Sequence, residues 1–161
     1  MNNSPIERAT HTLNTIIYGT IATASQDGKP WAAPQFITFD ADKATFYWCA
    51  SRKSQHAQNI LANHEAYITV YDSRALPGEG DGVYAQAQAD EVTDADELAK
   101  AFAQLRQRHG DVPYWSLEDV QSPDSPVTLF KATVQKMWIN AGGEEDGHFV
   151  LRRESVPFRS S

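Results

Sequence analysis

The chain has 161 residues, a formal net charge of −7, 41% hydrophobic and 22% charged residues, and one cysteine. This length suits one domain, over residues 1–161, that buries its own core without disulfide or metal staples. The acidic balance disfavours general binding to nucleic acid or to an anionic membrane, because both need a basic face. The lone Cys49 excludes an internal disulfide and a paired-cysteine metal motif, and it suits a cytoplasmic protein.

The N-terminal segment carries a helix signal and no targeting signal. Ser4 and Glu7 fit a capping box around Pro5, and the apolar residues that follow predict a helix over residues 4–17. The segment lacks the basic and apolar runs of a secretory signal, and the chain lacks a run of roughly 18 apolar residues for a membrane helix. We therefore expect no membrane association.

Segments rich in β-branched and aromatic residues follow, separated by turn-forming residues. Asp27-Gly28 is a strong hairpin signal between the first two segments. The predicted strands cover residues 19–25, 30–39, 44–49, 65–72, 82–92, 127–140 and 148–156. This pattern predicts a small, mainly β (α+β) antiparallel barrel of six or seven strands with about three helices.

Two further helices are predicted between the strands. One follows the third strand, from about residue 53 to 63, with Ile60 and Leu61 turned to the core. The other is capped by Thr93, has acids in its first turn and basic residues in its last, and ends at Gly110. The segment 112–126 is predicted to be an irregular link because of its prolines.

Two adjacent cations, Arg52 and Lys53, lie where the third strand is predicted to end and a helix to begin. The first turn of that helix joins free backbone N–H groups to both cations and to the Ser51 hydroxyl. This arrangement suits an anion such as phosphate. Hydrogen bonds to a charged group contribute about 1.5–3 kcal/mol each, against about 0.3–1 kcal/mol from the helix dipole, so the cations would dominate.

The local charge distribution supports an anion site at this turn. Residues 43–64 contain no Asp or Glu, whereas 21 acids in 161 residues would put about three in such a stretch. The lack of acids lowers the local repulsion of an anion. A pair of solvated surface charges is the alternative interpretation.

The order of several short motifs resembles the pyridoxamine 5′-phosphate oxidase-like family of FMN-binding split barrels. The motifs are Thr23, DGKP at 27–30, FITF at 36–39, FYW at 46–48, SRK at 51–53 and NILAN at 59–63. The later segment VTLFKATVQKMWIN is similar to the family's closing strand. The resemblance implies a homodimeric split barrel that acts on a small-molecule substrate, with one FMN at each of two sites between the subunits.

Ten residues of this chain match cofactor contacts that the resemblance implies. Arg52 and Lys53 match the residues that hold the FMN phosphate, and Ser51 belongs to the same turn. Trp138 is the candidate for a tryptophan that closes over the flavin from the other subunit. The matches along the flavin ring lie on the second and third strands and are Gln35, Phe36, Ile37, Thr38, Tyr47 and Trp48.

The chain departs from the true vitamer oxidases of this family at several matched places. Ala33 and Thr38 stand where those enzymes carry basic residues, and Trp48 stands where threonine is usual. The Arg-x-His substrate motif is missing near His148. The resemblance, together with these departures, implies an FMN-dependent oxidoreductase with another small-molecule substrate. The alternative is a non-catalytic dimeric barrel that binds F420, haem or another small ligand, and haem would need an axial histidine such as His56 or His148.

Overall fold

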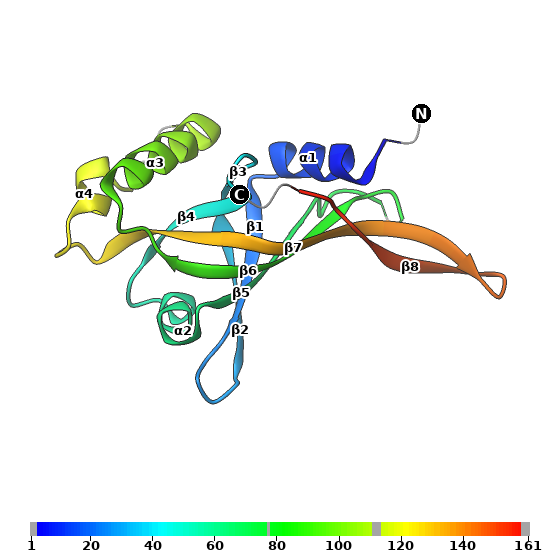
Figure 1. Cartoon of the computed structure of the whole chain (residues 1–161), viewed down its shortest axis with the longest axis horizontal. Coiled ribbons are helices and arrows are strands. Elements are labelled where there is room, and N and C mark those ends of the chain that lie inside the picture. The colour runs from blue at the N-terminus through cyan, green and yellow to red at the C-terminus, as the bar shows by residue number, and fades with distance from the viewer. Residues whose placement is uncertain (1–2, 77, 111–113, 159–161) are drawn as a thin grey trace.

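The computed structural model describes residues 3–158 except 77 and 111–113, and this part of the chain forms eight strands and four helices (Figure 1). The helices are α1 (Pro5–Thr15), α2 (Gln55–Asn63), α3 (Ala95–His109) and α4 (Leu117–Gln121). The strands are β1 (Tyr18–Ala24), β2 (Pro30–Phe36), β3 (Thr38–Asp40), β4 (Thr45–Ser51), β5 (Glu65–Tyr71), β6 (Gly82–Glu91), β7 (Val127–Glu145) and β8 (His148–Ser155). The predicted mainly β architecture is confirmed.

The strands pair antiparallel in one sheet, in the order β2-β1-β5-β6-β7-β4-β3, with β8 paired to β7. The two edge strands of this order, β2 and β3, are consecutive in the chain and are joined at Ile37. The Ile37 N–H donates to the Ile17 carbonyl at 3.0 Å, and the Ile37 side chain is buried. The sheet therefore curls back on itself without a ladder between its edges, as in a split barrel.

The single strand predicted over residues 30–39 is two strands with different partners. β2 pairs with β1, through the hairpin that Asp27-Gly28 predicted, and β3 pairs with β4. The change of partner occurs because the chain crosses the split of the barrel at Ile37. Gly28 has φ of 81°, the left-handed conformation that glycine adopts most readily in such a turn.

Two apolar clusters bury opposite faces of β4. Phe46 and Trp48 point into the barrel interior and pack with residues from β1, β5, β6 and β7. Tyr47 points to the other face, where it packs with Leu98, Phe102 and other residues of α3, α4 and β7. β4 is therefore enclosed on both sides, and Figure 1 shows α3 and α4 grouped at one end of the sheet.

Local signals position most helix ends. The Ser4–Glu7 capping box predicted for α1 is present. α3 is capped by Asp94 instead of Thr93, because the Asp94 carboxylate accepts the Glu97 N–H at 2.7 Å. None of the helices in the described ranges is long and apolar enough to cross a membrane.

Two helix predictions need correction. α2 begins at Gln55, two residues later than predicted, because residues 52–54 form a turn with Ser54 at the N-cap. Ile60 is buried as predicted, but Leu61 is 46% exposed because it lies on the outer face of α2. The segment predicted to be an irregular link contains the short helix α4, which Ser116 and Asp119 cap through reciprocal hydrogen bonds.

Candidate functional site

The turn between β4 and α2 is held by a local set of hydrogen bonds. The Ser51 hydroxyl accepts the Lys53 N–H at 3.2 Å, and the Ser54 hydroxyl donates to the Ser51 carbonyl at 2.8 Å. The Arg52 N–H donates to the Pro126 carbonyl at 2.9 Å, which ties the turn to the start of β7. The predicted cations therefore stand on a defined turn and not on a loose loop.

The N-terminus of α2 lacks a side-chain cap and an acidic residue. Ser54 occupies the N-cap but makes no side-chain cap hydrogen bond, and the first turn of α2 has no acidic residue. The N–H groups of this turn lack helical partners, and the helix dipole favours negative charge beside them. Lys53 is exposed next to this end, and no acid pairs with its ammonium in the part of the chain that the structure describes.

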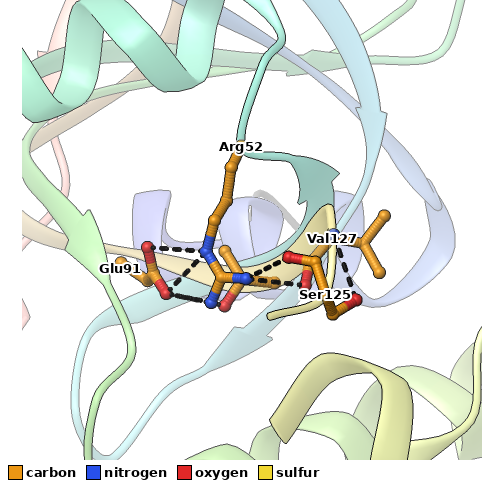
Figure 2. Close-up of polar contacts among 5 residues, drawn as sticks. Arg52, Glu91, Ser125 and Val127 are labelled. Atoms are coloured by element: carbon orange, nitrogen blue, oxygen red, sulfur yellow. Dashed lines mark hydrogen bonds and ion pairs between the residues drawn. The ribbon is translucent and has the colours of Figure 1, made fainter. Parts of the chain in front are cut away.

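Arg52 has a different environment, because its guanidinium donates hydrogen bonds to other residues of the chain (Figure 2). Its Nε donates to Glu91 Oε1 at 3.2 Å, and its Nη2 donates to the same oxygen at 2.6 Å. Its Nη1 donates to the carbonyls of Ser125 and Val127. The acid-free stretch 43–64 therefore does not leave Arg52 free of acids, because the fold brings Glu91 from the end of β6.

The two predicted ring contacts on β4 are enclosed side chains. Trp48 is fully buried in the barrel interior, with its ring 5.9 Å from that of Phe130. Tyr47 is 1% exposed, and its hydroxyl donates to Glu97 at 2.8 Å. Burial, followed by the contact with the Glu97 carboxylate, raises the pKa of Tyr47 far above its ordinary value. In this conformation neither side chain offers an accessible surface to a ligand.

The predicted ring contacts around β2 differ in exposure. Phe36 is 39% exposed and its ring stacks on Tyr18 with centroids 4.1 Å apart. Gln35 is half-buried, whereas Ile37 and Thr38 are buried at the split. β2 is an edge strand with only β1 as its partner, so its backbone groups on the other side have no strand to pair with.

Trp138 lies on the outer face of the sheet, the face that also carries Tyr18 and Phe36. Its β6 neighbour in the register is Tyr84, and its ring lies 6.4 Å from that of Tyr67, nearly parallel to it. Tyr84 in turn lies under the guanidinium of Arg153, which is 4.2 Å from the ring centroid. Trp138 is half-buried in this aromatic surface and keeps part of its ring accessible.

Two cavities lie away from the β4–α2 turn. A cavity of about 500 Å³ is lined by Arg8, Tyr71, Asp81, Tyr84 and Phe149 among others, near the start of β6, whereas Arg52 contacts the end of that strand. A cavity of about 450 Å³ against the outer face of β1 is lined by Tyr18, Thr20, Pro34, Thr69 and Tyr71 among others. The second cavity therefore lies beside the predicted ring contacts of β2.

The two candidate axial histidines are far from equivalent. His56 is 5% exposed, and its Nε2 lies 3.5 Å from the Ser54 hydroxyl. Burial lowers the pKa of His56 and favours its neutral form. His148 is exposed at the start of β8. The described residues contain no group of three or more His, Cys, Asp or Glu side chains that could hold a metal ion.

Comparison with protein-family models gives a match to pyridoxamine 5′-phosphate oxidase over residues 7–141. The chain belongs to this family. The matched residues cover most of α1, the strands β1 to β6, the helices α2 to α4, and the part of β7 that carries Trp138. None of the curated proteins matches the chain in sequence.

Solved structures that share the fold of this chain include proteins whose names give different ligands. A heme binding protein from Mycobacterium smegmatis has a TM-score of 0.71 and 20% identity, covering 95% of this chain and 59% of its own. A FAD-binding protein from Mesorhizobium loti has a TM-score of 0.63 and 17% identity, covering 85% and 94%. An F420 reductase has a TM-score of 0.58 and 20% identity, covering 79% and 93%. At these identities the likeness shows the shared fold alone.

Proposed function

We propose that this protein binds FMN and acts as an oxidoreductase on a small molecule other than pyridoxine 5′-phosphate. The observation that carries the proposal is the β4–α2 turn of a pyridoxamine 5′-phosphate oxidase family member. There the exposed Lys53 and the Ser51 hydroxyl immediately precede a helix N-terminus whose N-cap makes no side-chain hydrogen bond. These are the donors that a phosphate monoester requires.

The turn fits a phosphate in charge and in hydrogen bonding. A phosphate monoester carries about −1.5 to −2 charge at pH 7 and three strong acceptor oxygens. Lys53 and the α2 N–H groups supply donors, each worth about 1.5–3 kcal/mol to a charged acceptor. Ser51 accepts the Lys53 N–H, which leaves its own O–H to donate to a ligand. Arg52 adds to this set only when it exchanges Glu91 for the phosphate.

The isoalloxazine ring is expected along β2 and its junction with β3, at Gln35, Phe36, Ile37 and Thr38. Ile37 and Thr38 are buried, the Ile37 N–H donates to Ile17, the Ile37 carbonyl lies 3.1 Å from His109 Nε2, and Thr38 pairs with β4. The ring contact is therefore to the backbone of Gln35 and Phe36, on the side of β2 that has no strand partner. FMN, when bound, supplies hydride or electron transfer, and the protein supplies binding and orientation. Phe36 and Trp138 would shield the ring from water.

A second copy of the chain is the expected partner on the outer face of the sheet. This face exposes large aromatic side chains, with Tyr18 48%, Phe36 39% and Tyr71 54% exposed. Contiguous exposed apolar patches mark interaction surfaces. The proposal places the cofactor between the two copies, where Trp138 of one copy covers the ring held by the other.

Two residues disfavour pyridoxine 5′-phosphate as the substrate. The matched positions that are basic in vitamer oxidases are Ala33, which carries no charge, and Thr38, which is 5% exposed. A phosphorylated substrate would therefore lack cationic partners at both places. A neutral or unphosphorylated substrate fits these residues better.

The absorbance spectrum of the purified protein tests the cofactor assignment. We expect flavin bands, or quenching of FMN fluorescence on titration, together with a dimer by light scattering. A colourless protein that does not quench FMN fluorescence would remove the flavin proposal. A Soret band in its place would select the haem alternative.

A Lys53→Ala variant tests the phosphate position. We expect about tenfold weaker binding of FMN and unchanged binding of riboflavin, which lacks the phosphate. Lys100→Ala, which removes an exposed lysine of α3, is the matched control and should leave both affinities unchanged. An equal loss for FMN and riboflavin would show that Lys53 does not contact the phosphate.

A further inference from the structure

The hydrogen bonds of Arg52 use all three nitrogens of its guanidinium. Nε and Nη2 form a fork on the Glu91 carboxylate, and Nη1 donates to the carbonyls of Ser125 and Val127. A carboxylate and a phosphate accept the same planar fork of N–H donors. Glu91 therefore occupies the edge of Arg52 that a phosphate would take (Figure 2).

Glu91 is itself held in place for this contact. Thr128 donates its hydroxyl to Glu91 Oε1 at 3.0 Å, and Thr128 is buried at the start of β7. Glu91 ends β6, where its partner in the register is Phe130 of β7. The pairing of β6 with β7 and the Thr128 hydrogen bond therefore fix the position of the Glu91 carboxylate.

The ion pair is accessible enough to exchange partners. The side chains of Arg52 and Glu91 are 26% and 23% exposed, so water and small solutes reach the pair. Together with Lys53, the two groups give the turn a charge of +1, whereas the two cations alone would give +2. Because a phosphate monoester is close to a dianion at pH 7, the Glu91 charge lowers its attraction to the turn.

We propose that Glu91 is a specificity-determining residue that competes with phosphate for Arg52 and weakens the preference for phosphorylated over unphosphorylated flavins. This inference rests on the proposed function, because it concerns the same turn. In the native protein Lys53 and the α2 N-terminus make the standing phosphate contact, and Arg52 contributes in proportion to its release from Glu91. Neutralising Glu91 therefore strengthens the phosphate contact and leaves the ring contacts as they are.

A Glu91→Gln variant tests the competition, because glutamine keeps the size and the acceptor for Thr128 but removes the charge. The matched control is Glu97→Gln, which neutralises another partly buried acid, paired with Lys131 at 2.8 Å, without touching Arg52. FMN and riboflavin are titrated into each protein at low salt, and the ratio of riboflavin Kd to FMN Kd is compared. Circular dichroism melts show which variants are folded.

We expect Glu91→Gln to raise this ratio about tenfold, equivalent to about 1.4 kcal/mol, by lowering the Kd of FMN alone. Glu97→Gln should leave the ratio unchanged. An unchanged or lower ratio in folded Glu91→Gln would overturn the proposal and make Glu91 a purely structural partner of Arg52. If Glu91→Gln does not fold, Glu91→Asp is used; it withdraws the carboxylate by one methylene, and a ratio that does not rise there overturns the proposal.

A protein that binds no flavin would contradict the proposed function, and this outcome is distinguishable from a failure of the competition between Glu91 and phosphate. In that case the wild-type protein binds neither flavin, and inorganic pyrophosphate replaces them as the probe, with thermal stabilisation as the measurement. A larger stabilisation of Glu91→Gln than of the wild-type protein supports the competition at Arg52 even without flavin binding. Equal stabilisation, or none in either protein, overturns it.

Discussion

Two strands that the family resemblance places against the flavin, β4 and β2, have opposite environments. β4 has five buried and two half-buried residues, because the barrel interior covers one face and α3 and α4 cover the other. β2 has five exposed residues of seven, because it is an edge strand with one partner. The residues that match the family's flavin contacts therefore lie in a core strand in β4 and in an accessible strand in β2. In β4 only the end, at Ser51, leads to the candidate phosphate turn.

The strongest test of this contrast compares one tryptophan from each strand. Trp48→Ala should lower the free energy of unfolding by about 3–5 kcal/mol, because it empties a fully buried site in the barrel. Trp31→Ala, at the 49% exposed Trp31 of β2, should lower it by less than about 1 kcal/mol. Urea denaturation measures both values. Losses of similar size would contradict the division into a core strand and an open strand.

The second test concerns pH and the outward face of β4, where Tyr47 and Lys131 both contact Glu97. Burial raises the pKa of Glu97, but the hydrogen bonds from Lys131 and Tyr47 outweigh burial, so the pKa lies below its ordinary value. A carboxylate with a lowered pKa stabilises the folded state above its unfolded pKa of about 4.3, and this contribution is lost as pH falls through the folded pKa.

Glu97→Gln should therefore lower the free energy of unfolding by about 1–2 kcal/mol at pH 7, and the difference from the wild-type protein should shrink as the solution is acidified below about pH 4.5. Chemical denaturation at a series of pH values measures it. Glu144→Gln, which changes an exposed acid near the end of β7, is the control and should give a difference near zero throughout. A Glu97 difference that stays constant with pH would show that the carboxylate charge does not stabilise this face of β4.

The sequence predicted the features that local chemistry determines. Asp27-Gly28 specified the β1–β2 hairpin, and Ser4 with Glu7 specified the start of α1, because turns and caps depend on residues a few positions apart. The split at Ile37 was not predictable in this way, because residues 30–39 have a continuous strand composition. Their division follows from which strands they pair with across the sheet.

The environment of Arg52 shows the same limit at the candidate site. The stretch around it holds no acid, yet Glu91, which is 39 residues away in sequence, reaches it through the pairing of β6 with β7. The alternation of small and polar residues in β6 predicts a strand but does not indicate which strand end lies beside the turn. The phosphate role of Arg52 and Lys53 stays a prediction. The structure adds that Arg52 must first leave its ion pair with Glu91, whereas the exposed Lys53 has no such partner among the described residues.

Thiol labelling gives the test with the smallest effect on stability. Burial raises the pKa of Cys49 to about 12, so at pH 8 very little of this thiol is in the reactive thiolate form. An Ala32→Cys substitution in a Cys49→Ala background puts the only thiol on an exposed position of β2, where a pKa of about 8.5 is expected.

Under native conditions an alkylating reagent should modify the Ala32→Cys variant about a thousandfold faster than wild-type Cys49, with mass spectrometry as the measurement. Comparable fast rates would mean that reagent reaches the half-buried Cys49 of β4 as readily as an exposed residue of β2, and that the contrast between the strands fails. Slow labelling of both thiols would mean instead that another surface covers β2. Since Ala32 is open in the single chain, protection that disappears on dilution would identify that surface as a second copy. The experiment thereby separates an edge strand available to a ligand from one already buried in a dimer.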